Sequence, residues 1–251
     1  MIKIIVHGCN GKMGSVLVRL INNDDETVVV AGFDRTPDKC DHPFPVYSHL
    51  SDCSEKCDVI IDFSHHSLVP DLLDYCITTN TPVILATSGI SADQKKNVQE
   101  ASKKISVFQA PNMSMGVNVV MNLAIKAAEI LGNSFDIELI EKYHNKKNDS
   151  PSGTTLMIAN GLKDVFEDKK EFIFGRHGNM DQRTSADIGI HSIRGGTFIG
   201  EHTIIFAGED EIVEITHKAL SKDIFGLGAI KAAKFLINKE NGFYTMNDLV
   251  K

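Results

Sequence analysis

The stretch that decides the fold is IKIIVHGCNGKMG, residues 2–14, in which a run of apolar residues ends in a glycine-rich turn. A short run of Ile and Val that ends at glycine is typical of a buried strand. Behind the turn, apolar residues fall at the spacing of an amphipathic helix: Met13, Val16, Leu17, Leu20 and Ile21. The sequence therefore predicts a strand, a glycine turn and a helix.

The glycines of this turn are spaced like those of a dinucleotide-binding turn, except that Cys9 stands where the commonest pattern has its first glycine. Gly8 closes the strand, Gly11 lets the backbone approach a pyrophosphate, and Gly14 lets the helix pack closely on the strand. Asp34 follows 20 residues after Gly14, where the next apolar run ends. A tight turn without a ligand is the alternative, but the position of Asp34 favours a cofactor site.

The residues Asp34 and Arg35 bear on the choice of cofactor. Asp34 can accept hydrogen bonds from both ribose hydroxyls and repels a 2′-phosphate, whereas the guanidinium of Arg35 could pair with that phosphate. We therefore expect both NADH and NADPH to be used.

Further apolar runs extend this pattern along the first part of the chain. They lie at 27–34, 57–64, 82–89 and 105–112, and helical spacers at 68–79 and 92–104 separate the later ones. Short runs that are apolar on both faces and alternate with helices are what a parallel sheet covered on both sides requires. Residues 1–112 are therefore expected to form an α/β domain of the Rossmann type, with a doubly wound parallel sheet.

The pattern changes after Asn112. The sequence predicts a helix over 115–131, a half-exposed strand over 135–144, a helix over 153–166, and three closely spaced strands at 186–196, 198–208 and 211–219. The links between these last runs are too short for crossover helices, so neighbouring strands are expected to pair antiparallel in a mixed α+β domain over 113–220. A last helix, over 225–238, could pack on either domain.

Composition limits the function. The chain has 251 residues, 42% of them hydrophobic and 24% charged, with a formal net charge of −7. It should be globular, and its acidic balance argues against a nucleic-acid partner. Five cysteines, an odd number confined to the first third, indicate reduced thiols in a cytoplasm. We find no targeting segment and no apolar run of membrane-spanning length, and neither the cysteines nor the histidines have the spacing of a metal site.

A second polar cluster, EKYHNKKNDSPSGTT, occupies residues 141–155. Its end is typical of a helix start, with Ser150 or Ser152 as the cap and with N–H groups exposed at Gly153 and Thr154. Such a helix end binds anions, and Lys147 adds a cation, so the site could hold a carboxylate or a phosphate. The alternative is a well-capped helix after a solvated lysine loop.

These motifs, taken in order, resemble the 4-hydroxy-tetrahydrodipicolinate reductase family, long called dihydrodipicolinate reductases. The resemblance runs along nearly the whole chain and rests on GKMG, DFS, ATSG, APNMSMGVN, ELIEKYHNKKNDSPSGT, IHSIRGGTFIGEH and EITHKALSKDIFGLGAIKAAKFL. It implies NAD(P)H-dependent reduction of 4-hydroxy-tetrahydrodipicolinate in diaminopimelate and lysine biosynthesis. It also implies a homotetramer, with a dinucleotide-binding domain over 1–112 and 221–251 and a substrate-binding and tetramerisation domain over 113–220.

The resemblance assigns roles to particular residues. His144 corresponds to a substrate-binding histidine, Lys147 to a lysine implicated as proton donor, and Gly153 and Thr154, after Ser152, to the groups that hold a substrate carboxylate. The residues that correspond to cofactor contacts are Gly8, Cys9, Asn10, Gly11, Lys12, Met13, Asp34, Arg35, Ala86, Thr87, Ser88, Ala110, Pro111, Asn112 and Met113.

The chain departs from the family at Tyr143, where a histidine, commonly assigned as the catalytic acid or base, is usual. Phenols ionise only near pH 10, so a tyrosine can donate a proton but is a poorer base at neutral pH. Either Tyr143 serves in proton transfer, or Lys147 delivers the proton and Tyr143 only positions the substrate ring. We favour Lys147 and count Tyr143, His144 and Lys147 as candidate catalytic residues.

Other assignments stay open. Arg194 in IRGG and His202 in GEH are explained about as well by a sheet turn and a subunit contact, so both lie outside the predicted site. Two other functions fit the sequence: a nucleotide-binding regulator that has lost turnover, and a reductase of another carboxylated cyclic imine. Retention of Lys147 and of the Ser152–Thr154 turn argues against the regulator, because a sensor of the cofactor alone needs neither.

Overall fold

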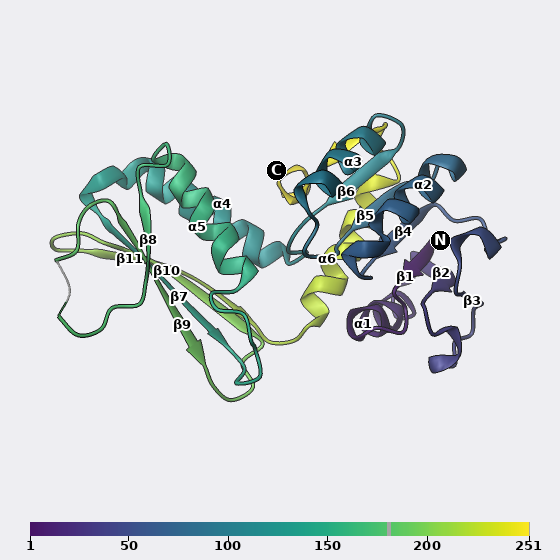
Figure 1. The fold of residues 1–251 in the computed structure, drawn as a ribbon, viewed down its shortest axis with the longest axis horizontal. Helices are drawn as coiled ribbons and strands as arrows, with labels where there is room; N and C mark the ends of the chain where they lie inside the picture. Colours follow the sequence, from purple (N-terminus) through teal and green to yellow (C-terminus); the bar gives the residue numbers. More distant parts are fainter. Residues whose placement is uncertain (180–181, 251) are drawn as a thin grey trace. The chain divides into compact units, whose positions relative to one another are not determined.

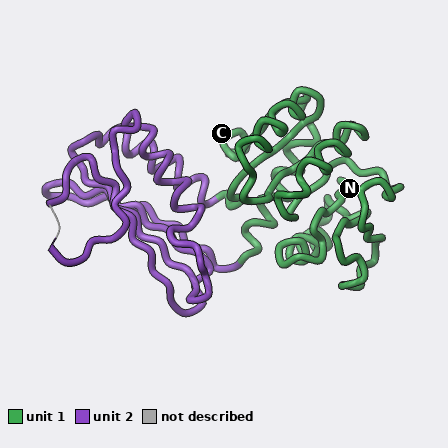
Figure 2. Tube along the Cα trace, in the orientation of Figure 1, with its two compact units in different colours: residues 1–115, 222–251 green, residues 116–221 purple. Residues whose placement is uncertain are grey.

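The computed structural model describes residues 1–179 and 182–250, and these form two compact units (Figures 1 and 2). Unit 1 consists of residues 1–115 and 222–251, and unit 2 of residues 116–221. The chain thus leaves the first unit once, builds the second, and returns to the first for its last strand and last two helices. Each unit has its own sheet and core, and each is described by itself below.

Unit 1 is built on a parallel sheet of seven strands, in the order β12-β6-β5-β4-β1-β2-β3. The strands are β1 (Ile2–His7), β2 (Thr27–Phe33), β3 (Val46–Tyr47), β4 (Val59–Asp62), β5 (Val83–Leu85), β6 (Ser106–Gln109) and β12 (Gly242–Tyr244). The five strands and the doubly wound fold predicted from the sequence are confirmed. The short edge strands β3 and β12 were not predicted, because two or three residues give no periodic signal.

Helices cover both faces of this sheet. They are α1 (Lys12–Ile21), α2 (Val69–Thr79), α3 (Ala92–Ser102), α6 (Asp223–Leu236) and α7 (Met246–Leu249), with short 3-10 turns η1 (Pro37–Lys39), η2 (Leu50–Asp52) and η3 (His66–Leu68). Successive residues of β1 point to opposite faces: Ile4 packs in the core that contains residues of α1 and α6, and Ile5 in the core that contains residues of α2 and α3. The last long helix therefore packs in unit 1. The side chain of Met113, which the sequence analysis assigned to the second domain, is buried in the core under α6.

Unit 2 has a mixed sheet of five strands in the order β11-β10-β7-β9-β8. The strands are β7 (Asp136–Tyr143), β8 (Glu171–Phe174), β9 (Asp187–Arg194), β10 (Gly200–Ala207) and β11 (Ile212–Ala219). Strand β10 is antiparallel to β11, as expected for strands that are close in sequence, and it is also antiparallel to β7, a pairing that was not predicted. The expected pairing of β9 with β10 is wrong. Strand β7 lies between them and pairs parallel with β9, because the crossover through α5 (Gly153–Val165) returns the chain on the far side of β7.

Two helices, α4 (Met115–Leu131) and α5, pack on one face of this sheet, and the turn η4 (Gly132–Ser134) ends α4 (Figure 1). Alternate residues of β7 point toward these helices, beginning with the buried Ile137 and Leu139. Glu141 and Tyr143 continue in the same phase. The helix-covered face of the sheet thus changes from apolar to polar along β7, and this change places the candidate site.

Helix α4 corrects one expectation. With η4 it forms a segment, Met115–Ser134, of 20 residues with a window of mean hydropathy 1.3, long and apolar enough to cross a membrane by length and composition alone. The sequence analysis found no such run. Lys126 and Glu129 are its only charged residues. Its Val120, Ala124 and Ala128 belong to the core of unit 2, and core helices of soluble proteins meet the same criterion.

Candidate active site

The glycine turn after β1 has the close packing that a nucleotide-binding turn requires. Gly8 has a φ of +82°, a conformation that favours glycine. A Cβ atom on Gly14 would lie 2.0 Å from the carbonyl oxygen of Gly8, so only glycine fits where α1 crosses the turn. Gly11 is the residue before α1 and donates its N–H to the Gly8 carbonyl at 3.0 Å. The N–H groups at the start of α1 therefore lie at the carboxyl end of β1, where an anion binds in folds of this type.

Asp34 lies directly after β2, next to this turn. Its carboxylate accepts hydrogen bonds from the backbone N–H of Asn10 at 3.1 Å and of Thr36 at 3.0 Å. The Asn10 side chain in turn donates to the Thr36 carbonyl at 2.6 Å. The two loops are thus tied together, and the carboxylate is held at the sheet edge where a ribose would lie. Arg35 is exposed beside it.

A hollow of about 1060 Å³ lies at this edge of unit 1. Of the predicted cofactor residues, it is lined by Gly8, Gly11, Asp34 and Arg35. Residues that the sequence analysis did not select also line it, among them His7, Phe33, Phe63, Ser64, His65 and Leu68. Several of these follow β4, and the rule that the carboxyl ends of parallel strands share one edge could have found them. The residues fit a dinucleotide.

The other predicted cofactor residues lie in three segments. Cys9, Asn10, Lys12 and Met13 belong to the glycine turn and the first residues of α1 and are not among the residues that line the hollow. Ala86, Thr87 and Ser88 follow β5, and residues 110–113 follow β6, so both segments begin at the same sheet edge but do not line the hollow. The side chains of Cys9 and Met113 are buried in the core, so only their backbone atoms can face a ligand.

The buried carboxylate of Asp62 connects the loops after β4 and β5. It accepts hydrogen bonds from the Thr87 hydroxyl at 2.6 Å and the Ser64 N–H at 3.0 Å, and Nδ1 of His7 lies 3.0 Å away. Burial raises the pKa of Asp62, but these neighbours outweigh it and hold the pKa below its usual value. Asp62 therefore stays ionised and fixes the segment that contains Thr87.

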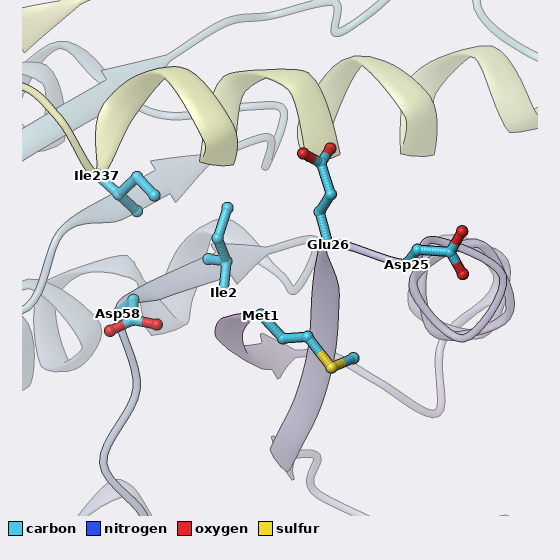
Figure 3. A pocket seen from close by; sticks show the side chains of 6 residues that line it. All are labelled: Met1, Ile2, Asp25, Glu26, Asp58 and Ile237. Atoms are coloured by element: carbon cyan, nitrogen blue, oxygen red, sulfur yellow. The ribbon is translucent and has the colours of Figure 1, made fainter.

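A second hollow in unit 1, of about 650 Å³, is shown in Figure 3. It is lined by Met1, Ile2, Asp25, Glu26, Asp58 and Ile237, and so lies where β1, β2 and β4 begin. Ligands of such sheets bind at the carboxyl ends of the strands, and this hollow is at the other end. Glu26 is also paired with Lys234. The larger hollow is therefore the candidate cofactor site.

In unit 2, the polar segment 141–155 leads into the start of α5. Ser152, rather than Ser150, is the N-cap: its hydroxyl accepts the N–H of Thr155 at 3.2 Å. Gly153, the first residue of the helix, is exposed, and a Cβ atom built on it would meet nothing within 4 Å. The helix therefore begins at open space at Gly153, and the positive end of its dipole there favours an anion.

Glu141 fixes this helix start to the sheet, and the sequence analysis missed it. It is fully buried and accepts hydrogen bonds from the Ser152 N–H at 2.9 Å and from Nη2 of Arg194 at 2.5 Å. The hydroxyls of Thr155 and Ser192 also donate to it, at 2.6 and 2.8 Å. Burial raises its pKa, but these donors lower the pKa of Glu141 to about 2. The sequence contained a signal for this role, because Glu141 is a charged residue at a position of the predicted strand that alternation places in the core.

Lys147 and Tyr143 lie together next to this helix start. The Lys147 ammonium is 4.6 Å from the centre of the Tyr143 ring and 2.8 Å from a carboxylate oxygen of Asp149. Arg194 also lies over the ring, with Cζ at 5.5 Å from its centre, and donates to the Asp149 carbonyl at 2.7 Å. Arg194 therefore contacts both Tyr143 and Asp149 of the polar segment, although the sequence analysis left it outside the site.

Two histidines complete the site. His144 follows Tyr143; its carbonyl accepts the Lys147 N–H at 3.2 Å, and its buried Nδ1 has no hydrogen-bond partner among the described residues. His202, on β10, is 5% exposed, and its Nε2 lies 3.2 Å from the Tyr143 hydroxyl. Burial lowers the pKa of His202 to about 4, so its ring is neutral at physiological pH.

Within 1–179 and 182–250, no group of three or more His, Cys, Asp or Glu side chains is placed to hold a metal ion.

The fold and the two candidate sites define a class: a two-domain enzyme of the Rossmann type, with a hollow that fits a dinucleotide on one unit and an open helix start beside a cation on the other. Family models assign the chain more narrowly. The model described as dihydrodipicolinate reductase, N-terminus, matches residues 2–113, and that described as dihydrodipicolinate reductase, C-terminus, matches residues 116–250. The chain belongs to the dihydrodipicolinate reductase family.

Individual relatives carry names of the same family. The chain is 49% identical to the 4-hydroxy-tetrahydrodipicolinate reductase of Caldanaerobacter subterraneus subsp. tengcongensis, over 100% of this chain and 99% of that protein. It is 41% identical to the enzyme of the same name from Clostridium novyi, again over 100% and 99%. Among solved structures, dipicolinate-bound dihydrodipicolinate reductase from Paenisporosarcina sp. TG-14 matches with a TM-score of 0.82 at 24% identity, over 98% of this chain and 99% of that one.

Proposed function

We propose that the chain catalyses the NAD(P)H-dependent reduction of 4-hydroxy-tetrahydrodipicolinate to tetrahydrodipicolinate in diaminopimelate and L-lysine biosynthesis. The observation that carries the proposal is the open start of α5 at Gly153, with the cation of Lys147 held nearby in a chain of this family. A helix start and a cation suit a small dicarboxylate, and the structure from Paenisporosarcina is named as dipicolinate-bound.

Gly153 and Thr154 bind a carboxylate of the substrate. Ser152 caps the helix and is itself fixed by Glu141, so the N–H groups of the first turn are oriented before a ligand arrives. The dipole of α5 favours a negative charge at this end. His144, which follows Tyr143 and is partly exposed, supplies a further polar contact to the substrate.

Lys147 delivers the proton to the substrate ring, and Tyr143 positions Lys147. The ammonium group is a proton donor held between the face of the Tyr143 ring and the Asp149 carboxylate. A side chain so constrained approaches the substrate in one geometry, which lowers the entropic part of the barrier. Tyr143 thus replaces the usual family histidine without having to act as a base.

The nicotinamide cofactor supplies the hydride when it is bound. The residues that hold it are the glycine turn, Asp34 and Arg35, together with the backbone after β5 and β6, where Thr87 is fixed by Asp62. Asp34 binds the ribose of NADH, and Arg35 offsets its charge when the ribose carries a phosphate. Both cofactors are therefore accepted.

The second face of the sheet in unit 2 is the proposed contact between copies. It carries partly exposed apolar side chains, among them Ile140, Ile193 and Ile205, opposite the face on which α4 and α5 pack. Burying such a face in a second sheet stabilises an oligomer. The protein acts as a homotetramer in the cytoplasm, without nucleic-acid or membrane partners.

The test is oxidation of NADH and of NADPH by the purified chain with freshly generated 4-hydroxy-tetrahydrodipicolinate. Turnover with both cofactors, inhibited by the planar competitor pyridine-2,6-dicarboxylate, is expected. Cofactor binding without turnover would indicate a regulator, and turnover of a different cyclic imine alone would indicate a related reductase.

A further inference from the structure

His202 lies directly behind Tyr143 on the helix-covered face of the sheet in unit 2. It stands on β10, opposite Glu141 of the neighbouring strand β7. Its ring meets the Tyr143 ring edge to face, with centres 5.6 Å apart and planes at 73°, and Nε2 is 3.2 Å from the hydroxyl oxygen. At 5% exposure the histidine is buried. The Tyr143 hydroxyl therefore has a fixed partner on the side of the sheet.

The other ring nitrogen decides which way this hydrogen bond runs. Nδ1 of His202 is buried and has no hydrogen-bond partner within the described part of the chain. A neutral imidazole has one N–H and one lone pair. A buried N–H without a partner is rare in proteins, whereas an acceptor without one is better tolerated. The proton therefore belongs on Nε2, which donates to the Tyr143 oxygen and leaves the phenolic proton free to point away from the sheet.

Glycine on the same strand makes room for this arrangement. Gly200 is two residues before His202 and points to the same face, and a Cβ atom there would lie 3.0 Å from Cε1 of Tyr143 and 3.3 Å from its hydroxyl oxygen. Any side chain at position 200 would thus press on the ring. Strand β10 thus leaves room for the Tyr143 ring at Gly200 and forms a hydrogen bond with its hydroxyl from His202.

We propose that His202 is a positioning residue for the reduction: its Nε2–H fixes the ring of Tyr143, on whose face the Lys147 ammonium lies. This inference rests on the proposed reductase function. Two contacts connect the three residues. Nε2 of His202 lies 3.2 Å from the Tyr143 hydroxyl oxygen, and Nζ of Lys147 lies 4.6 Å from the centre of the Tyr143 ring.

The charged and titratable groups that surround His202 do not replace this contact. Glu141 faces it from β7, but the Glu141 carboxylate oxygens accept from Ser152, Thr155, Ser192 and Arg194. His217 faces it from β11, with ring centres 6.4 Å apart, too far for a hydrogen bond between the rings. The Lys147 ammonium is held by Asp149.

The kinetic test uses two substitutions at His202. His202→Leu removes the donor at similar volume, and we expect kcat to fall about tenfold, with the KM for NADH unchanged, because the contact lies on unit 2. His202→Gln places an amide N–H near the position of Nε2, and we expect it to recover most of kcat. In a Tyr143→Phe background, His202→Leu should have no further effect, because the hydroxyl it positions is gone.

The matched control is Phe206→Leu. Phe206 is on the same strand and face, 1% exposed, and has no polar atom. We expect it to lower Tm while kcat stays close to that of the wild-type chain. A loss of kcat that tracks Tm across all variants, or an equal loss from His202→Leu with and without the Tyr143 hydroxyl, would overturn the proposal.

A spectroscopic measurement separates this proposal from the proposed function. ¹⁵N NMR of histidine-labelled wild-type chain, which needs no turnover, should show His202 as the neutral Nε2–H tautomer. An Nδ1–H tautomer would overturn the positioning role even in an active reductase. The Nε2–H tautomer in a chain that reduces no substrate would contradict the proposed function and leave the Tyr143–His202 hydrogen bond standing.

Discussion

The ammonium group of Lys147 lies 4.6 Å from the centre of the Tyr143 ring, where a cation is attracted to the face of an aromatic side chain. Asp149 holds the same ammonium from another side at 2.8 Å. The residue at the usual position of a family histidine is thus in direct contact with the lysine. In the proposed function, this contact lets Tyr143 position the cation without losing a proton.

The first prediction separates the two candidate proton donors. Lys147→Ala should lower kcat by about 100-fold or more, the range for loss of a general acid, whereas Tyr143→Phe keeps the ring under the ammonium and should lower kcat much less. Steady-state kinetics with the natural substrate measure both. Lys146→Ala, the exposed neighbouring lysine, is the matched control and should be close to wild type. Equal losses from Tyr143→Phe and Lys147→Ala would show that the phenol takes part in proton transfer.

The second prediction concerns the open space at the start of α5. Gly153→Ala puts a methyl group where nothing lies within 4 Å, so the fold should tolerate it and Tm should not fall. The same methyl group obstructs the carboxylate, so the inhibition constant of pyridine-2,6-dicarboxylate should rise about tenfold or more. Asn160→Ala, at an exposed position further along α5, should change neither quantity. Unchanged inhibition in Gly153→Ala would mean that the dicarboxylate binds elsewhere.

The third prediction concerns Arg35. Because its guanidinium offsets the charge of a 2′-phosphate, Arg35→Ala should lower kcat/KM for NADPH about tenfold and that for NADH only slightly. The ratio of the two constants is the measurement. Lys96→Ala on α3, an exposed lysine paired with Asp93, controls for the loss of a positive charge. A loss of equal size with both cofactors would rule out phosphate recognition by Arg35.

The fourth prediction is the acid stability of unit 2. The pKa of Glu141 is about 2 in the folded protein, against an ordinary value of 4.5, so between these pH values the unfolded chain binds more protons at this site than the folded one. Stability from Glu141 is complete above about pH 4.5 and is lost as the pH falls toward 2, to a total of about 3 kcal/mol. Urea unfolding of wild type and of Glu141→Gln across this pH range measures the free energy of unfolding. We expect this free energy to fall less steeply with decreasing pH in the variant than in the wild type. Parallel curves would contradict the assignment.

The sequence predicted the fold where its signal was local. Continuous apolar runs marked the strands β1, β2, β4, β5 and β6, because strands buried on both faces need apolar residues throughout. The place of β7 between β9 and β10 could not be read from loop length, since it depends on which side of β7 the crossover through α5 returns.

The sequence predicted those site residues that are contiguous along the chain and missed those that strand pairing brings together. The segment 141–155 stood out because its polar residues are contiguous. Arg194 and His202 approach it from β9 and β10, so only the strand pairing brings them to Tyr143. Both fall in the helix-facing phase of their strands, as does Glu141. A polar residue in a buried phase was therefore the one local signal for all three.

The most direct test of the central claim is a crystal structure of the chain with NADH and pyridine-2,6-dicarboxylate bound. We predict a carboxylate oxygen within hydrogen-bond distance of the Gly153 N–H and the Thr154 side chain, with the Lys147 ammonium, rather than the Tyr143 hydroxyl, within reach of the ring. A dicarboxylate bound away from the start of α5, or a ring contacted by Tyr143 while Lys147 stays on Asp149, would contradict the account.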